Sequence, residues 1–145
     1  RLGVAPAEAS CDARESLANT LAGRLLVPTA WYRVACLDCD HDLAALKARF
    51  ATTSHELLAR RWLDAAADRV VVTIADHGRV CQRLANWDGR VPRATADELV
   101  CLAAAHRSGQ PSESLSAVGR IRAWPVHEPE WRREIARTEV ALFDD

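Results

Sequence analysis

Residues Thr53 to Asp64, TSHELLARRWLD, contain a histidine followed directly by a glutamate, which is how the zinc-peptidase motif H-E-x-x-H begins. That motif needs a second imidazole four residues after the first, so that both point from one helix face at a single Zn²⁺ while the glutamate polarises the bound water. Here His55 is followed at that position by Ala59, and two arginines come next. Their positive charge would oppose a divalent cation. The stretch is therefore not a zinc site.

A second candidate for metal chemistry is the stretch CLDCDH, which supplies Cys36, Cys39 and His41. Structural zinc needs four ligands, and no second pair stands at a suitable spacing, because Cys81 and Cys101 are isolated in the sequence. We expect ordinary thiols in a loop between helices, with metal binding by Cys36, Cys39 and His41 as the alternative.

The most specific pattern lies in a helix expected over residues 12–27. Its segment ESLANTLAGRLLVP resembles E-x-x-A-N-x-F-A-x-x-L-L-x-P of the ImmA/IrrE family of zinc metallopeptidases, with Leu21 in place of the usual phenylalanine. The matching positions are Glu15, Ala18, Asn19, Ala22, Leu25, Leu26 and Pro28. The elements that follow also resemble that family, namely an aromatic pair and then a helix pair similar to D-L-x-x-L-A-x-R-F-x-V-S. Here the chain has Asp42, Leu43, Leu46, Arg49, Phe50 and Ser54.

The resemblance implies a zinc ion held by the two histidines of H-E-x-x-H, with Glu15 as the third ligand. Asn19 lies one turn further on the same helix face and is expected either to orient Glu15 from an outer shell or to be a polar residue in a buried helix groove. No H-E-x-x-H occurs in these 145 residues. This chain alone is therefore expected to be non-catalytic and without zinc, and zinc is expected only in a full-length protein that has the histidine pair. A purely structural role for Glu15 is the alternative, since it stands three residues after Asp12 in a capping box.

Between residues 42 and 64 the apolar spacing predicts two short helices joined by a tight turn, the helix-turn-helix pattern, with Ser54 as N-cap of the second. The residues available for nucleic-acid contact are Lys47, Arg49, Arg60 and Arg61, offset by Asp42, Glu56 and Asp64. So balanced a surface predicts weak, salt-dependent phosphate binding. We expect weak or no DNA binding.

The second half changes character. A β-branched run after Arg69, a turn at residues 76–78 and a second extended run predict a hairpin, and Thr95 with Glu98 opens a helix through about Ala105. Residues 106–114 are expected to be a loop, and LSAVGRIRAW a strand. The last stretch fits either a terminal helix, with Trp131 and Ile135 one turn apart, or an extended arm. Trp124 and Trp131 are expected to anchor the terminal segment to the core, and His127 carries little specificity. His106 has a local explanation at a helix end, where it meets the helix dipole favourably.

The fold class expected is α+β. A helical half with the helix-turn-helix-like pair covers residues 1–67, and a small antiparallel sheet with one or two helices covers residues 68–145 as a docking or regulatory module. The formal charge is −1, from 19 Lys and Arg against 20 Asp and Glu, which gives no general attraction to nucleic acid or to an anionic membrane. No apolar run approaches a membrane span, and five cysteines without a secretion signal predict reduced thiols in the cytoplasm.

The predicted function is that of a portion, or a degenerate member, of an ImmA/IrrE-like metallopeptidase. The resemblance implies that the whole enzyme cleaves a helix-turn-helix repressor in stress regulation. One alternative is a DNA-binding transcription regulator with a ligand-sensing α+β half. Another is a non-catalytic protein-interaction domain.

Overall fold

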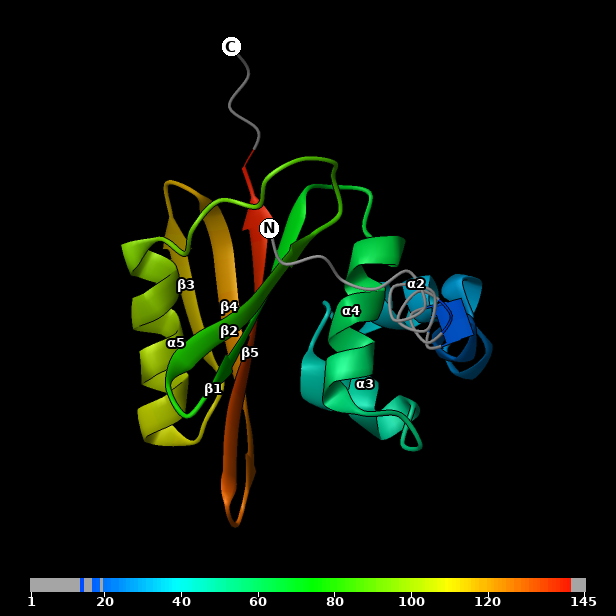
Figure 1. The fold of residues 1–145 in the computed structure, drawn as a ribbon, viewed down its shortest axis with the longest axis horizontal. Coiled ribbons are helices and arrows are strands. Elements are labelled where there is room, and N and C mark those ends of the chain that lie inside the picture. The colour runs from blue at the N-terminus through cyan, green and yellow to red at the C-terminus, as the bar shows by residue number, and fades with distance from the viewer. Residues whose placement is uncertain (1–13, 15–16, 19, 142–145) are drawn as a thin grey trace, which may run out of the picture.

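The computed structural model describes residues 14, 17–18 and 20–141, and its centre is a five-stranded antiparallel sheet with helices on both faces (Figure 1). The strand order is β2-β1-β5-β4-β3. The strands are β1 Val70–Asp76, β2 Arg79–Ala85, β3 Ser112–Ser116, β4 Gly119–Glu128 and β5 Trp131–Val140. The helices with defined bounds are α2 Thr29–Asp38, α3 Leu43–Arg49, α4 His55–Ala65 and α5 Ala96–Ser108, and residues 20–26 are helical ahead of α2. The expected α+β class is confirmed.

The alternation of side chains in the strands builds two cores. In the central strand β5, Ile135 joins Val72 and Trp124 in the core beneath α2, α3 and α4. The next residue, Ala136, joins Ile121 in the core beneath α5. Successive side chains of a strand point to opposite faces, so β5 contributes neighbouring side chains to both cores. The sheet is therefore the middle of three layers, as Figure 1 shows.

The predicted helix pair forms, with the predicted N-cap at Ser54 and a further N-cap at Asp42. Asp42 accepts a hydrogen bond from the backbone N–H of Ala45 at 2.8 Å, and Ser54 accepts one from the N–H of Leu57 at 3.0 Å. Each bond satisfies a backbone donor that the first turn of a helix leaves free. None of the described helices has the length and apolar character needed to span a membrane.

The helical half is fixed to the sheet by packing and by charge. Trp62 of α4 lies against Trp124 of β4, with ring centroids 5.4 Å apart. Arg133 of β5 donates to Glu56 of α4 and to Asp76 of β1, each at 2.6 Å. The two predicted modules therefore share one core across the link between α4 and β1.

Two segments that were expected to be loops are ordered elements. Helix α2 occupies the segment that was expected to be a polar loop, because Tyr32, Ala35 and Cys36 recur at helical spacing and are buried together. Helix α5 continues through Ser108 before Gly109 ends it in the left-handed conformation, at φ 64°. Strand β3 then occupies the rest of the segment expected to be a loop.

The predicted strand LSAVGRIRAW is a hairpin between β3 and β4. Its turn closes at Gly119, which has φ 124° and pairs with Ser116. A Cβ atom at this position would lie 1.8 Å from the carbonyl oxygen of Glu139, so only glycine fits. The terminal stretch resolves as strand β5, which pairs with β1 and β4.

Candidate ligand pocket

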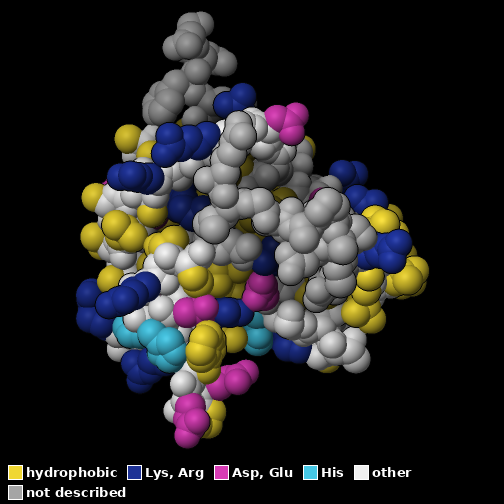
Figure 2. Space-filling model, in the orientation of Figure 1, with side chains coloured by type: hydrophobic (Ala, Val, Ile, Leu, Met, Phe, Trp, Pro, Cys, Tyr) yellow, Lys and Arg dark blue, Asp and Glu magenta, His cyan; other side chains and the backbone are white. Residues whose placement is uncertain are grey.

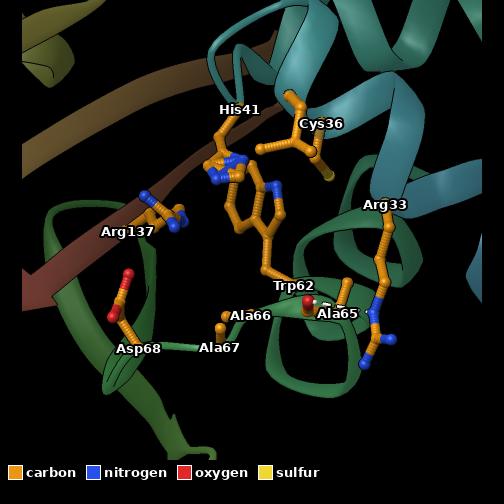
Figure 3. Close-up of a pocket in the computed structure, with 10 residues that line it drawn as sticks. Arg33, Cys36, His41, Trp62, Ala65, Ala66, Ala67, Asp68 and Arg137 are labelled. Carbon is orange, nitrogen blue, oxygen red and sulfur yellow. Dashed lines mark hydrogen bonds between the residues drawn. The ribbon is translucent and has the colours of Figure 1, made fainter.

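A pocket of about 360 Å³ opens between the helical half and the sheet (Figure 3). Its walls come from α2, α4, the link between α4 and β1, and β5. The residues that line it include Arg33, Cys36, His41, Trp62, Asp68 and Arg137. Pockets of about 300–1,000 Å³ with mostly apolar walls and a few polar groups are typical of small-molecule sites.

Three buried nitrogen atoms of these residues have no hydrogen-bond partner within the described part of the chain. They are Nδ1 of His41, Nε1 of Trp62 and Nε of Arg137. Figure 3 shows the three side chains gathered on one side of the pocket. Trp62 lies near the Cys36 sulfur, a weak acceptor, but its N–H makes no hydrogen bond. A buried donor without an acceptor costs about 1–3 kcal/mol, so a ligand that supplies acceptors here is favoured.

His41 is neutral near pH 7. Burial, together with the positive charges of Arg137 and Arg122, lowers the pKa of His41 to about 4. The Trp62 indole N–H and the Arg137 Nε–H can only donate hydrogen bonds. The neutral His41 beside them carries no positive charge that would compete with them for a bound anion.

Two guanidinium groups, of Arg33 and Arg137, and the carboxylate of Asp68 line the pocket. Arg33 lies at the exposed edge and donates from Nε to the carbonyl oxygen of Ala65 at 3.2 Å. The Arg137 side chain is only 4% exposed, and its Nη1 pairs with Glu139. The Nε–H of Arg137 takes no part in that ion pair. Charge and donors together suit a carboxylate or another small anion.

The Cys36 thiol is a poor nucleophile. Burial raises the pKa of Cys36 to about 11, so the thiolate is scarce at neutral pH. The Tyr32 hydroxyl donates to the carbonyl oxygen of Leu58 at 2.5 Å, and burial raises its pKa as well.

The cysteine and histidine residues singled out in the sequence do not converge as metal ligands. Cys36 is buried in α2, and the Cys39 thiol donates weakly to the carbonyl oxygens of Cys36 and Asp42 at 3.9 and 3.8 Å. Within the described residues, these two thiols and His41 do not form a group with ligand atoms close to one another. Two of the three line the pocket instead, namely Cys36 and His41.

The predicted zinc ligand Glu15 and its neighbour Asn19 lie outside the described residues. The four predicted nucleic-acid contacts are all placed, and each has an acceptor within the protein. Lys47 donates to the carbonyl oxygens of Ala51 and Thr53, and Arg49 pairs with Asp38 at 2.9 Å.

The two arginines of α4 are directed inward. Arg60 pairs with Glu56 at 2.8 Å and donates to the side chain of Gln82 at 2.6 Å. Arg61 is 4% exposed, and its guanidinium donates to the carbonyl oxygen of Val27 and to the hydroxyl of Thr29. The structure does not bring the four cations together on one free face.

The sequence did not identify Arg137 or Trp62 as site residues. Residues 41, 62 and 137 come from a loop, a helix and a strand, and no spacing in the sequence relates them. It also treated His106 and His127 separately, whereas both contact Glu134. No family model, curated protein or solved structure matches this chain.

Proposed function

We propose that this chain is the non-catalytic, ligand-binding portion of an ImmA/IrrE-like protein, and that its pocket binds a small organic anion. One observation carries the proposal: three buried nitrogen atoms without partners in the described structure, on His41, Trp62 and Arg137, line a single pocket. The pattern from Glu15 to Pro28 supports the family assignment, and the pocket supports the ligand-binding role.

The pocket walls define the chemistry of the ligand. Leu37, Ala65 and the ring of Trp62 offer apolar surface, which suits a flat or branched carbon skeleton. The N–H groups of Trp62 and Arg137 would donate to a carboxylate, with Arg33 adding charge at the edge. Because the inner nitrogen atoms are themselves buried, the lining side chains must move slightly when the carboxylate reaches them. We therefore expect binding coupled to a small rearrangement between α4 and β5.

An uncovered apolar surface supports the view that the chain is part of a larger protein. Seven of the twelve exposed large hydrophobic side chains in the described part lie on residues 17–37. Leu25 is 81% exposed, Leu37 77% and Trp31 71%. Exposed apolar patches of this kind mark interaction sites. In the proposed arrangement, the peptidase part with its zinc-binding helix covers them, and the cytoplasmic location expected for the family belongs to the same proposal.

Calorimetric titration with benzoate tests the pocket. Benzoate carries a carboxylate on an apolar ring, and benzamide is its neutral counterpart of nearly the same shape. We expect saturable binding of benzoate and much weaker binding of benzamide. Trp62→Phe keeps the ring but removes the N–H, and we expect about a tenfold loss of benzoate affinity, the effect of one hydrogen bond to a charged group.

Trp87→Phe is the matched control, because Trp87 stacks under Arg69 and does not line the pocket. It should leave benzoate binding unchanged. Equal binding of benzoate and benzamide, or equal losses in the two tryptophan variants, would remove the anion-binding role.

The family assignment has a separate test. In a chain that also carries the H-E-x-x-H helix, we expect one zinc ion more than the 145 residues bind alone, and Glu15→Ala should release that additional ion. Retention of the additional ion in Glu15→Ala would leave Glu15 as a helix cap and would contradict the peptidase assignment, whatever the pocket binds.

A further inference from the structure

Three side chains from three elements converge at the C-terminal end of α5. His106 lies in the last turns of α5, His127 near the end of β4 and Glu134 near the start of β5. Their ligand atoms lie within 4.8 Å of one another, and no second such group of His, Cys, Asp and Glu side chains occurs among the residues that the structure describes. Glu134 pairs with Pro125, so His127, two residues further, projects from the same face of the sheet toward α5.

The Glu134 carboxylate is buried, and only one of its two oxygen atoms contacts a polar partner in the described part of the protein. Its side chain is 1% exposed, and Oε1 lies 2.8 Å from Nδ1 of His106 and 2.6 Å from Nε2 of His127. Oε2 is buried without a hydrogen-bond partner in the described part of the protein. Its ion-pair partners are the two histidines rather than a lysine or an arginine. Buried charges in proteins are paired or coordinate metals, and this one has a free oxygen beside two imidazoles.

We infer that His106, His127 and Glu134 bind one transition-metal ion of the zinc class. Two imidazole nitrogens and one carboxylate are a common donor set for Zn²⁺, whereas Ca²⁺ and Mg²⁺ require six or more ligands, mostly oxygen. A tetrahedral ion with bonds of about 2.0–2.1 Å places its ligand atoms about 3.3 Å apart. The two N···O distances must therefore lengthen by about 0.6 Å when the metal replaces the shared protons.

The surroundings allow that movement and favour a cation. The side chains of His106 and His127 are 28% and 22% exposed, so they can shift and water can take the fourth position. The partial exposure of both imidazoles gives the metal access from solvent, and Figure 2 shows that histidine side chains reach the surface on this face of the molecule. The C-terminal end of a helix carries partial negative charge, which favours a cation beside His106.

The site lies on the α5 side of the sheet and the pocket on the other, so the two are independent. The bound ion joins the end of α5 to the β4–β5 hairpin, which extends beyond the rest of the sheet (Figure 1). Its expected effect is a metal-dependent stabilisation of that hairpin and of the helix end.

Zinc titration of the metal-free chain at pH 7.5, followed by calorimetry and thermal unfolding, tests the site. We expect one Zn²⁺ per chain and a rise in Tm that a chelator reverses. Glu134→Gln and His127→Gln should each weaken binding by more than about tenfold, the loss seen even when an outer-shell partner is removed. His55→Gln, which removes an imidazole on the α4 side of the sheet, should leave zinc binding unchanged.

Cobalt distinguishes this site from a cysteine site. Bound Co²⁺ should show the visible bands of tetrahedral nitrogen and oxygen ligation without thiolate charge-transfer absorption. Thiolate absorption that Cys36→Ser abolishes would overturn the assignment. So would zinc binding that survives both Glu134→Gln and His127→Gln, or the absence of saturable binding in the wild type, which would leave a hydrogen-bonded triad. If Glu134→Gln fails to fold, His127→Gln and His106→Gln decide the outcome.

Discussion

Glu98 shows how one buried residue can connect two layers of this fold. As part of the capping box of α5 it accepts from the backbone N–H of Thr95 at 2.8 Å. It also accepts from the hydroxyl of Thr138 at 2.7 Å and pairs with Arg83 at 3.2 Å. The sequence predicted the cap but not the links to β2 and β5, because nothing in the spacing relates residue 98 to residues 83 and 138.

Replacing Glu98 with glutamine should destabilise the chain. The variant leaves Arg83 without its charged partner and weakens the bonds from Thr95 and Thr138. We expect a loss of about 2 kcal/mol or more in the free energy of unfolding at pH 7, as measured by urea denaturation. Asp97→Asn, an exposed acid in the same helical turn, is the control and should change stability by less than about 0.5 kcal/mol.

The effect of Glu98 should fade in acid. Burial alone would raise the pKa of Glu98, but hydrogen bonds from Thr95 and Thr138 and the charge of Arg83 outweigh it and hold the pKa below its usual value. A carboxyl with a depressed folded pKa stabilises the protein above its unfolded pKa of about 4.3 and loses that contribution as pH falls through the folded value. The gap between wild type and Glu98→Gln should therefore narrow below about pH 4. A constant gap from pH 7 to pH 3 would contradict this account.

His41 gives the pocket a pH dependence of known sign. In the free protein its pKa is about 4, lowered by burial and by Arg137 and Arg122 against the smaller opposing effects of Glu139 and Asp40. A bound carboxylate stabilises the imidazolium, so its pKa rises in the complex and binding takes up a proton. Benzoate affinity should increase as pH falls from 7 to 5, with proton uptake visible in buffers of different ionisation enthalpy. Identical affinity at both pH values would mean that the carboxylate lies away from His41.

At the scale of elements, α4 is placed to support the sheet rather than to enter a DNA groove. Its apolar side packs on β1 and β4, Arg61 is buried, and Arg60 is paired with Glu56. We expect no duplex binding at physiological salt in a fluorescence anisotropy titration, and weak binding at low salt through the exposed Arg49. Tight binding at physiological salt that Lys47→Ala and Arg49→Ala abolish would favour the transcription regulator instead.

Elements with local signals were predictable from the sequence. Ser54 and the pair Thr95 and Glu98 marked two helix starts, and the turn at residues 76–78 marked the first hairpin. Strand β5 was ambiguous, because Trp131 and Ile135 share a face both at helical spacing and at period two. Its pairing with β1 and β4 makes it a strand, and such long-range contacts cannot be predicted from the sequence of one segment.

The pocket and the histidine cluster could not be predicted from the sequence for the same reason. Cys36 and His41 were noticed for metal chemistry, yet their neighbours in space are Trp62 and Arg137. His106 had a sufficient local explanation at a helix end, so nothing pointed to Glu134, 28 residues away. Each site is assembled by the sheet order, which joins the last strand to the first.

At the scale of the whole molecule, the surface of residues 17–37 is expected to act in contacts rather than in folding. Leu25→Glu and Leu37→Glu each place a charge where the side chain is already more than three-quarters exposed. We expect changes in the free energy of unfolding within about 0.5 kcal/mol, together with less self-association in sedimentation experiments. A loss of several kcal/mol would show that these leucines belong to the fold of this chain.

The central claim, that the pocket binds a small organic anion, is tested most directly by the indole N–H signal of Trp62 in a ¹H–¹⁵N spectrum. The chain has five tryptophans, so the Trp62 signal is assigned by its absence in Trp62→Phe. We predict that benzoate shifts this signal in a saturable manner, that benzamide does not, and that the Trp87 signal stays in place. An unmoved Trp62 signal at saturating benzoate, or equal shifts with benzamide, would contradict the claim.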